Sequence, residues 1–387
     1  MTHSCPVVIV GGGPAGTAAA AQLGKLGITS KIIEEASKIG GVIYRGPLRN
    51  THSLPHLDDN LKRAMAALQT RYHANRRHIE LLENTRVLGP EGTHSLLLNK
   101  DETLSNIEYQ ELILATGCHE RSIPFEGWQL PGVMLMGGVQ LQIKSGLVQP
   151  GRKMALVGTG PLLPLVACQL HKSGIDVVGV YEASQFSKLA KEAVALLNKP
   201  KLTLSGLSMM GYLKKHNIPF HYGWGIVSAQ GENALKSITV APYNEHWQAD
   251  THNAQTLEVD ALGVGYGFVA RSQLAMLMGL DHQYSTVSGS IPTLDQWQHS
   301  SVNNVYVAGD SSGLLGADAA MCEGQIAAIR IAQSRGVLTG KEAAQHAGKV
   351  MRKLERLKRF RFGFDRFSAR QVGLMELAKP ETVVCRC

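Results

Sequence analysis

The chain has 387 residues, of which 44% are hydrophobic and 18% charged, and its formal net charge is +8. This length and composition predict two or three domains with sizeable cores. The sequence shows no apolar run long enough to span a bilayer, no signal-peptide pattern, and no disulfide framework among its six scattered cysteines. We therefore expect a cytoplasmic protein with no membrane span, and peripheral association with the inner face of the membrane is the alternative.

A nucleotide-binding motif lies at the start of the chain. Residues 7–10 form an apolar strand pattern that runs directly into a Gly-x-Gly-x-x-Gly loop made by Gly11, Gly13 and Gly16. The first glycine permits the tight turn, the second lets the backbone approach a pyrophosphate, and the third lets the next helix pack closely. We predict that this loop, with Pro14 and Ala15, binds the pyrophosphate of a dinucleotide.

An acidic residue follows the second predicted strand, residues 30–33. Glu34 lies 21 positions after Gly13, a spacing that suits a carboxylate accepting hydrogen bonds from the adenosine ribose. Glu35 is the alternative acceptor, although its position suits this role less well. The adenosine half of a dinucleotide site is therefore predicted in the first 35 residues.

Two later segments favour FAD over NAD as this dinucleotide. The apolar strand at residues 112–114 ends in Ala115, Thr116 and Gly117, small residues that let the chain pass close to a cofactor. A second apolar strand, residues 305–308, ends in Gly309 and Asp310. The Asp310 carboxylate can accept hydrogen bonds from the ribityl hydroxyls of a flavin, which NAD lacks.

A helix is predicted from about Asp318 to Gln333. We expect its start to face the pyrimidine edge of the flavin, where backbone N–H groups and the helix dipole stabilise negative charge. Asp318 and Ala319 are the predicted contacts at this end.

The order of these motifs resembles the flavoproteins with two dinucleotide-binding domains, the broad family of pyridine-nucleotide and thioredoxin-type reductases. The resemblance implies an α/β fold of two Rossmann-like domains with a C-terminal helical tail. It implies an FAD-binding domain in two segments, residues 1–123 and 268–336, and an inserted nucleotide-binding domain at residues 124–267. Residues 337–387 are expected to form the basic helical tail, and Val87 is the implied backbone contact to the adenine.

The motif recurs in the middle of the chain in altered form. A strand pattern at residues 153–157 precedes Gly158, Gly160 and Pro161, and a later strand ends at Glu182. Leu163 replaces the third glycine and holds the helix away from the strand, which argues against a normal site for a hydride-donating NAD(P)H. These four residues, Gly158, Gly160, Pro161 and Glu182, are candidates to bind a second nucleotide, with ATP, FAD and NAD as the alternatives.

Basic residues are concentrated between Lys349 and Arg370, above apolar residues at helical spacing that include Val350, Leu354 and Leu357. We predict an amphipathic helix docked by one face. Its basic face is either solvated or a docking surface for another subunit. The chain has no motif for reading nucleic acid, so we do not expect a nucleic-acid partner.

Cysteine spacing argues against disulfide reduction. Cys118 and Cys322 each stand alone, and we predict both as small buried residues, with His119 also structural. The only close pair, Cys385 and Cys387, lies far from the flavin motifs.

Three further segments narrow the resemblance: residues 40–45, residues 115–133, and the pair 261–269 and 308–320. They are similar to the FAD-containing alpha subunits of heteromeric dye-linked amino-acid and opine dehydrogenases, which include subunits of opine oxidase, of proline and hydroxyproline dehydrogenases and of hydrogen cyanide synthase. The resemblance implies FAD contacts at Gly41 and Arg45. Val42 departs from the family, which often has Gln there.

The same resemblance implies partners and further cofactors. These are a beta flavoprotein subunit that oxidises the amine, a small iron-sulfur subunit, and FMN where subunits meet. Cys385 and Cys387 resemble the first two ligands of a C-terminal 2Fe-2S domain. Because a cluster of this kind needs four thiolates, the other ligands are expected beyond this chain or from a partner.

These observations predict an FAD-dependent oxidoreductase that acts as the electron-transferring subunit of a heteromeric amine, amino-acid or opine dehydrogenase. Its flavin is expected to accept electrons from the partner's flavin and to pass them to an iron-sulfur centre. No residues for amine oxidation are identified in this chain. The alternatives are a stand-alone NAD(P)H-dependent FAD reductase and a non-catalytic assembly subunit that holds nucleotides structurally.

Overall fold

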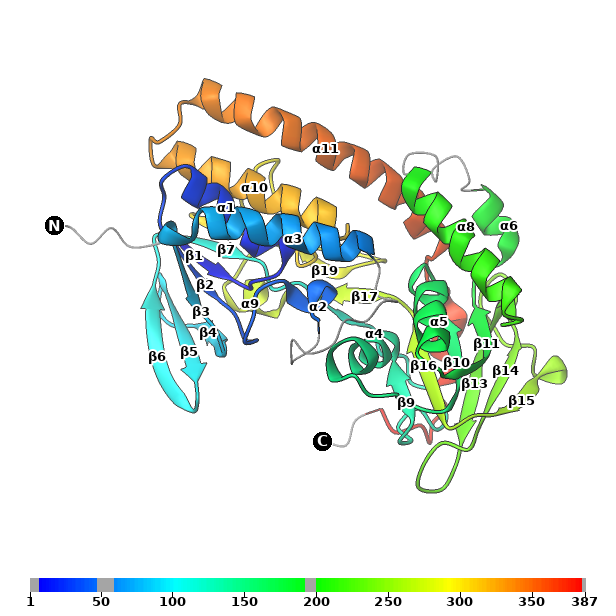
Figure 1. Ribbon diagram of the computed structural model, residues 1–387. Helices are drawn as coiled ribbons and strands as arrows, with labels where there is room; N and C mark the ends of the chain where they lie inside the picture. The colour runs from blue at the N-terminus through cyan, green and yellow to red at the C-terminus, as the bar shows by residue number, and fades with distance from the viewer. Residues whose placement is uncertain (1–6, 47–58, 192–199, 385–387) are drawn as a thin grey trace. The chain divides into compact units, whose positions relative to one another are not determined.

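The computed structural model describes residues 7–46, 59–191 and 200–384 (Figure 1). The described chain forms two compact units. Unit 1 contains residues 7–45, 59–119 and 269–358, and unit 2 contains residue 46 with 120–191, 200–268 and 359–384. The chain leaves unit 1 through β8 (Cys118–Glu120) and returns through β17 (Phe268–Ala270).

A five-stranded parallel sheet lies at the centre of unit 1, in the strand order β20-β7-β1-β2-β3. Its strands are β1 (Val7–Val10), β2 (Ser30–Ile33), β3 (Ile79–Leu82), β7 (Glu111–Leu114) and β20 (Val305–Val307). Every residue of β1, β7 and β20 is buried, because elements cover both faces of the sheet. Burial on both faces explains why these strands read as continuous apolar runs.

Helices pack on one face of this sheet (Figure 1). They are α1 (Pro14–Lys25), α3 (Asp59–Ala74) and α10 (Ala317–Ser334). Alanines line the α1 and α10 faces that meet, and Gly324 of α10 packs directly on the backbone of Ala15 in α1. A Cβ atom at Gly324 would overlap the Ala15 carbonyl oxygen, so only glycine permits this approach.

Smaller elements complete unit 1. An antiparallel sheet is formed by β4 (Thr85–Pro90), β5 (Ser95–Lys100) and β6 (Thr103–Glu108), and a hairpin by β18 (His282–Ser285) and β19 (Gly289–Pro292). The short helices are α2 (Gly41–Tyr44), η1 (Arg76–His78) and α9 (Gln273–Leu277).

Unit 2 repeats the parallel arrangement in the order β12-β11-β10-β16-β9. Its strands are β9 (Val133–Leu135), β10 (Lys153–Gly158), β11 (Asp176–Glu182), β12 (Phe220–Tyr222) and β16 (Ala261–Gly265). Its helical elements are α4 (Met136–Leu141), the π-helical η2 (Gln142–Gly146), α5 (Leu162–Lys172), α6 (Phe186–Lys191), α8 (Pro200–Lys215), η3 (Thr251–Asn253) and η4 (Val372–Leu377). A second, antiparallel sheet contains β13 (Trp224–Gln230), β14 (Ser237–Pro242) and β15 (Gln255–Glu258).

The long helix α11 (Gly340–Phe367) begins before the basic segment that the sequence singles out. Its Leu354 and Leu357 are buried against Ala319 and Cys322 of α10, as expected for an amphipathic helix docked by one face. The segment after residue 336 does not form a unit of its own. Residues up to Lys358 belong to unit 1, and those from Arg359 belong to unit 2 because Leu374 and Leu377 are buried in its core.

The predicted fold class, two Rossmann-like α/β units with a C-terminal helix, is confirmed. The helix predicted from about Asp318 to Gln333 is α10, which is one residue longer at each end. In the described part of the chain, no helix combines the length and the apolar content needed to cross a membrane.

Replacing Gly324 with alanine tests the approach of α1 and α10. Because the added methyl group would overlap the Ala15 carbonyl oxygen, we expect the free energy of unfolding to fall by about 1–3 kcal/mol. Gly211→Ala in the exposed middle of α8 is the matched control, since nothing lies within 4 Å of its added Cβ. Helix propensity predicts that this control gains up to about 1 kcal/mol. Chemical denaturation of both variants measures the difference, and equal stabilities would contradict the packing argument.

Candidate functional site

In the loop after β1, contacts with the protein's own backbone leave no room for a Cβ atom at two of the glycines. Gly11 has φ +104°, and a Cβ atom there would overlap the carbonyl oxygen of Ala115 at the end of β7. A Cβ atom at Gly16 would overlap the carbonyl oxygen of Gly11. These two positions therefore close the turn and seat α1 against β1, as the motif predicts.

Gly13 differs from these two because no contact with the described residues requires a glycine there. Its φ of −70° suits any L-residue, and its missing Cβ would meet only the Cα of Gly41, at 3.9 Å. Gly13 is half-buried and directly precedes the first residue of α1, Pro14. Open space in front of a helix start fits the approach of a pyrophosphate, so the loop fits a dinucleotide such as FAD.

The two acidic candidates after β2 have different environments. Glu34 is buried, and its Oε2 and Oε1 accept hydrogen bonds from the backbone N–H groups of Gly12, at 2.6 Å, and Ala36, at 2.9 Å. Each carboxylate oxygen has a further lone pair with which to accept from a ribose hydroxyl. Glu35 is exposed and forms ion pairs with Arg271 and Arg86. The geometry therefore favours Glu34 as the ribose acceptor.

The ends of β7 and β20 lie side by side, because the two strands are paired in the sheet. Thr116 Oγ1 donates to the carbonyl oxygen of Arg271 at 2.6 Å, and Gly117 has φ +77°. Asp310 Oδ1 accepts from the N–H group of Gly316 at 3.3 Å. The predicted small-residue segment and the predicted ribityl acceptor therefore meet at one sheet edge, the carboxyl edge where α/β folds bind nucleotides.

Cys118 differs from the sequence expectation. It is half-buried rather than buried, and its Sγ lies 3.5 Å from Asp310 Oδ2. Cys322 is buried as predicted, and burial raises the pKa of its thiol. Pairing of β7 with β20 determines the position of Cys118, which no local sequence signal could reveal.

Ala319, a predicted cofactor contact, lies in the first turn of α10. Its side chain is fully buried against α11, in one cluster with Leu354 and Leu357. The whole residue, backbone included, is buried in the packing between the two helices. Asp318 is exposed in the first turn of α10.

Three further predicted FAD contacts lie in unit 1. Gly41 begins α2 with φ +63°, and its added Cβ would lie 3.1 Å from the Cα of Gly13, so it adjoins the loop. Arg45 follows α2 and is half-buried. Val87 lies in β4, where a β-bulge shifts the pairing with β5 between Val87 and Gly89. Such a bulge re-aims the backbone locally.

The second loop, in unit 2, repeats the acidic contact. Glu182 at the end of β11 accepts hydrogen bonds from Gly160 N–H at 2.8 Å and Ser184 N–H at 2.9 Å, just as Glu34 holds Gly12 and Ala36. Burial raises the pKa of Glu182 to about 7. Leu163 is buried in the core beneath α5.

The chain's own C-terminal segment lies beside this second loop. Ser184 is fully buried, and its hydroxyl donates to the carbonyl oxygen of Phe367, the last residue of α11, at 2.9 Å. Leu374 and Leu377 of η4 then pack against the core that contains Tyr181. The residues that follow Glu182 are therefore covered by protein, whereas Glu35, which follows Glu34, is exposed.

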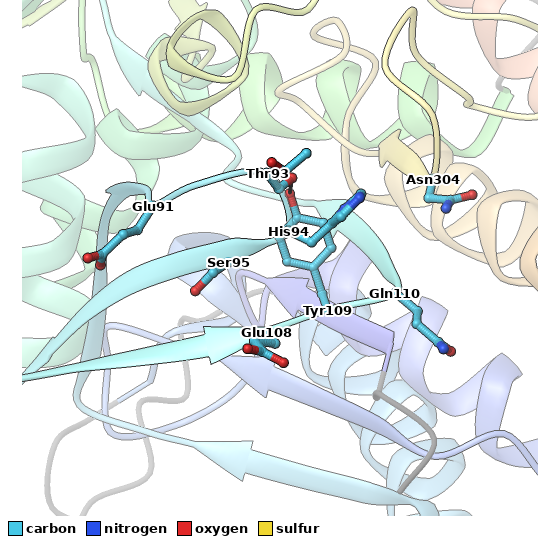
Figure 2. Close-up of a pocket in the computed structure, with 8 residues that line it drawn as sticks. All are labelled: Glu91, Thr93, His94, Ser95, Glu108, Tyr109, Gln110 and Asn304. Atoms are coloured by element: carbon cyan, nitrogen blue, oxygen red, sulfur yellow. Dashed lines mark hydrogen bonds between the residues drawn. The ribbon is translucent and has the colours of Figure 1, made fainter. Parts of the chain in front are cut away.

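A polar pocket of about 520 Å³ also lies in unit 1 (Figure 2). Figure 2 shows His94 and Tyr109 side by side in it, and their rings meet edge to face with centroids 5.8 Å apart. Asn304, which also lines it, precedes β20, and Gln110 precedes β7. The pocket is thus at the amino ends of these strands, opposite the carboxyl edge, and is not the dinucleotide site.

Comparison with known proteins is consistent with this geometry. The family model for pyridine nucleotide-disulphide oxidoreductases matches residues 5–336. The chain belongs to that family. FAD is accordingly the cofactor of this chain, which is an FAD-dependent oxidoreductase.

Relatives of known name match almost the whole chain. Hydrogen cyanide synthase subunit HcnB of Pseudomonas protegens is 51% identical over 381 residues, covering 98% of this chain and 81% of its own length. An opine oxidase subunit of Agrobacterium tumefaciens is 25% identical over 393 residues, covering 98% of this chain and 76% of its own.

Solved structures share the fold. The L-proline dehydrogenase of P. horikoshii superposes with a TM-score of 0.65 and 20% identity, covering 91% of this chain and 58% of that chain. The thioredoxin reductase of T. acidophilum gives a TM-score of 0.61 and 15% identity, covering 85% and 98%.

Cys385 and Cys387, the predicted iron ligands, lie outside the described residues. Among residues 7–46, 59–191 and 200–384, no group of three or more His, Cys, Asp or Glu side chains is arranged to hold a metal ion.

The variant Gly13→Val tests the assignment of the unit 1 loop. Since the protein leaves room for the new side chain, we expect the apo-protein to keep its stability within about 0.5 kcal/mol. FAD retention should be abolished because the side chain occupies the path of the pyrophosphate. Flavin released on denaturation measures the bound FAD, and an unchanged flavin content would refute the assignment.

The buried carboxyl group of Glu182 predicts a pH dependence. Its pKa is about 7 in the folded protein, against an ordinary value of 4.5. Between these pH values the native state binds more protons than the unfolded state does, so the free energy of unfolding falls as pH rises from about 4.5 through 7. In Glu182→Gln, we expect this decline in stability to shrink by about 1–3 kcal/mol.

Urea denaturation followed by tryptophan fluorescence suits the test, because Trp128, Trp224 and Trp247 lie in unit 2. Glu232→Gln, which removes an exposed charge of the same unit, is the control. An unchanged slope in Glu182→Gln would contradict the expectation.

Proposed function

We propose that this chain is the electron-transferring FAD subunit of a heteromeric amino-acid or opine dehydrogenase. The observation that carries the proposal is the match of 98% of the chain to proteins named as subunits, hydrogen cyanide synthase HcnB with 51% identity and an opine oxidase subunit with 25%. In such an assembly a partner flavoprotein oxidises the amine.

We propose the following roles for the unit 1 residues, which the geometry of the site supports. The loop at Gly11–Gly16 receives the pyrophosphate, Glu34 accepts from the adenosine ribose, and Asp310 accepts from the ribityl chain. Asp318 and Ala319 lie in the first turn of α10, whose dipole favours negative charge at the flavin. Bound FAD supplies a carrier for electrons that arrive from the partner.

Unit 2 supports this proposal over a stand-alone NAD(P)H reductase. Its loop has Leu163 at the position of the third glycine, and the residues after Glu182 are covered by the C-terminal segment. A second nucleotide at Gly158, Gly160 and Pro161, whether ATP, FAD or NAD, is a separate proposal and must fit beside the Phe367 carbonyl group.

Further components of the assembly are proposals of the same kind. Cys385 and Cys387 are proposed as the first two thiolates of a 2Fe-2S cluster whose other ligands come from outside this chain. FMN where subunits meet, together with a small iron-sulfur subunit, completes the proposed electron path. Peripheral contact with the inner face of the membrane is proposed as a site for the terminal acceptor.

Isolated and co-expressed forms of the chain test the proposal. The isolated FAD-loaded chain should not oxidise proline, opines or glycine, and NADH should not bleach its flavin. Co-expression with its beta subunit should give a complex that oxidises an amine, and the same complex carrying Gly13→Val should assemble but lose turnover with an external dye.

Amine oxidation by the isolated chain would overturn the proposal, and rapid bleaching by NADH would favour a stand-alone reductase. A chain that lacks flavin but retains another nucleotide would favour a non-catalytic role in assembly.

A further inference from the structure

Glu323 is a charged residue in the most tightly packed part of unit 1. It lies in α10 between Cys322 and Gly324, and its side chain is only 3% exposed. An ionised carboxylate in such a place is costly unless hydrogen bonds compensate for the loss of water. Its partners therefore indicate why a glutamate occurs on the buried face of this helix.

Glu323 forms hydrogen bonds with two residues of the turn that follows β20. Its Oε2 accepts from the N–H group of Gly309 at 2.8 Å and lies 3.0 Å from Ser312 Oγ. These two residues flank Asp310, the predicted acceptor for the ribityl chain. One carboxylate oxygen thus ties both ends of the turn to α10.

A third hydrogen bond connects Ser312 to Gly309, so that Glu323, Ser312 and Gly309 form a closed hydrogen-bond network. Ser312 Oγ also lies 2.8 Å from the carbonyl oxygen of Gly309. A hydroxyl group has one proton, so Ser312 donates either to Glu323 or to Gly309 at a given moment. When Glu323 is protonated it can donate to Ser312, which then donates to Gly309, and the turn remains bonded in both states.

The charged and titratable groups around Glu323 come from three elements. Asp310 on the turn opposes ionisation of Glu323, and Lys358 on α11 favours it. Cys322 is its titratable neighbour on α10. From α1, Ala15 and Ala19 pack against Gly324, and neither titrates. Burial is the largest effect and raises the pKa of Glu323 to about 7.

We propose that Glu323 is a positioning residue of the FAD site, which fixes the turn that presents Asp310 and holds a buried negative charge beside it. Through the first role it determines how tightly FAD is retained. Through the second it lowers the reduction potential of the bound flavin, because reduction adds negative charge near an existing one. The inference rests on FAD binding in unit 1 but not on the partner subunit.

Two substitutions separate these roles. Glu323→Gln keeps an oxygen that can accept from both Gly309 and Ser312 while removing the charge. Glu323→Leu removes both hydrogen bonds. Glu80→Gln, at an exposed position of β3, is the control for loss of one negative charge.

FAD affinity and flavin reduction potential are measured on apo-protein reconstituted with FAD. We expect Glu323→Gln to bind FAD as the parent does, with a more positive potential whose dependence on pH is shallower around pH 7. Glu323→Leu should lose affinity by about tenfold or more. Glu80→Gln should match the parent in both measurements.

Each outcome decides between the alternatives. A Glu323→Gln potential equal to that of the parent at every pH would overturn the electrostatic role, and full FAD affinity in Glu323→Leu would overturn the positioning role. If Glu323→Leu does not fold, Ser312→Ala replaces it, with weaker FAD binding expected and unchanged binding counting against the proposal. If the parent chain itself binds no FAD, the proposed function is wrong. If the parent binds FAD but the variants behave as the parent does, only the Glu323 proposal is wrong.

Discussion

The close approach of α1 and α10 at Ala15 is the constraint on which the unit 1 site depends. Gly324 of α10 packs on the Ala15 backbone, and the missing Cβ of Gly309 faces the Ala15 side chain. One residue at the start of α1 therefore contacts both α10 and the turn that carries Asp310. Gly11, packed on the carbonyl group of Ala115, adds β7 to the same junction. Because all these contacts involve backbone or small side chains, the pyrophosphate loop and the ribityl acceptor are held in a fixed relation that larger residues would break.

The glycine-loop motif occurs twice in this chain, in two different structural environments. In both, a buried glutamate at the end of the second strand accepts from two backbone N–H groups, so this contact supports the loop whether or not a ligand is bound. The two loops differ in the residues that surround them. The first loop has open space at Gly13, whereas the second has protein beside Ser184. Comparison of the two explains why the motif alone does not establish nucleotide binding.

Sequence reasoning predicted most of the fold because the signals were local. Apolar strands followed by glycine loops identified both parallel sheets, and helix start and stop signals after Asp310 identified α10. It did not predict contacts that depend on the packing of distant segments. The contact of Cys118 with Asp310 requires β7 and β20 to pair, and the burial of Ala319 requires α11 to fold back on α10. Glu323 did have a signal, since it is the one acidic residue in the mostly small and apolar segment from Ala319 to Ala332, but its role becomes visible only with its partners in place.

The central claim, that the first loop binds FAD and the second does not, is tested most directly by hydrogen exchange of the apo-protein and the FAD-loaded protein. FAD should slow exchange of backbone amides at residues 11–17, 34–36 and 309–320. Exchange at residues 158–163 and 182–184 should be slow in both forms and unchanged by FAD. Protection by FAD at the second loop, with none at the first, would contradict the account.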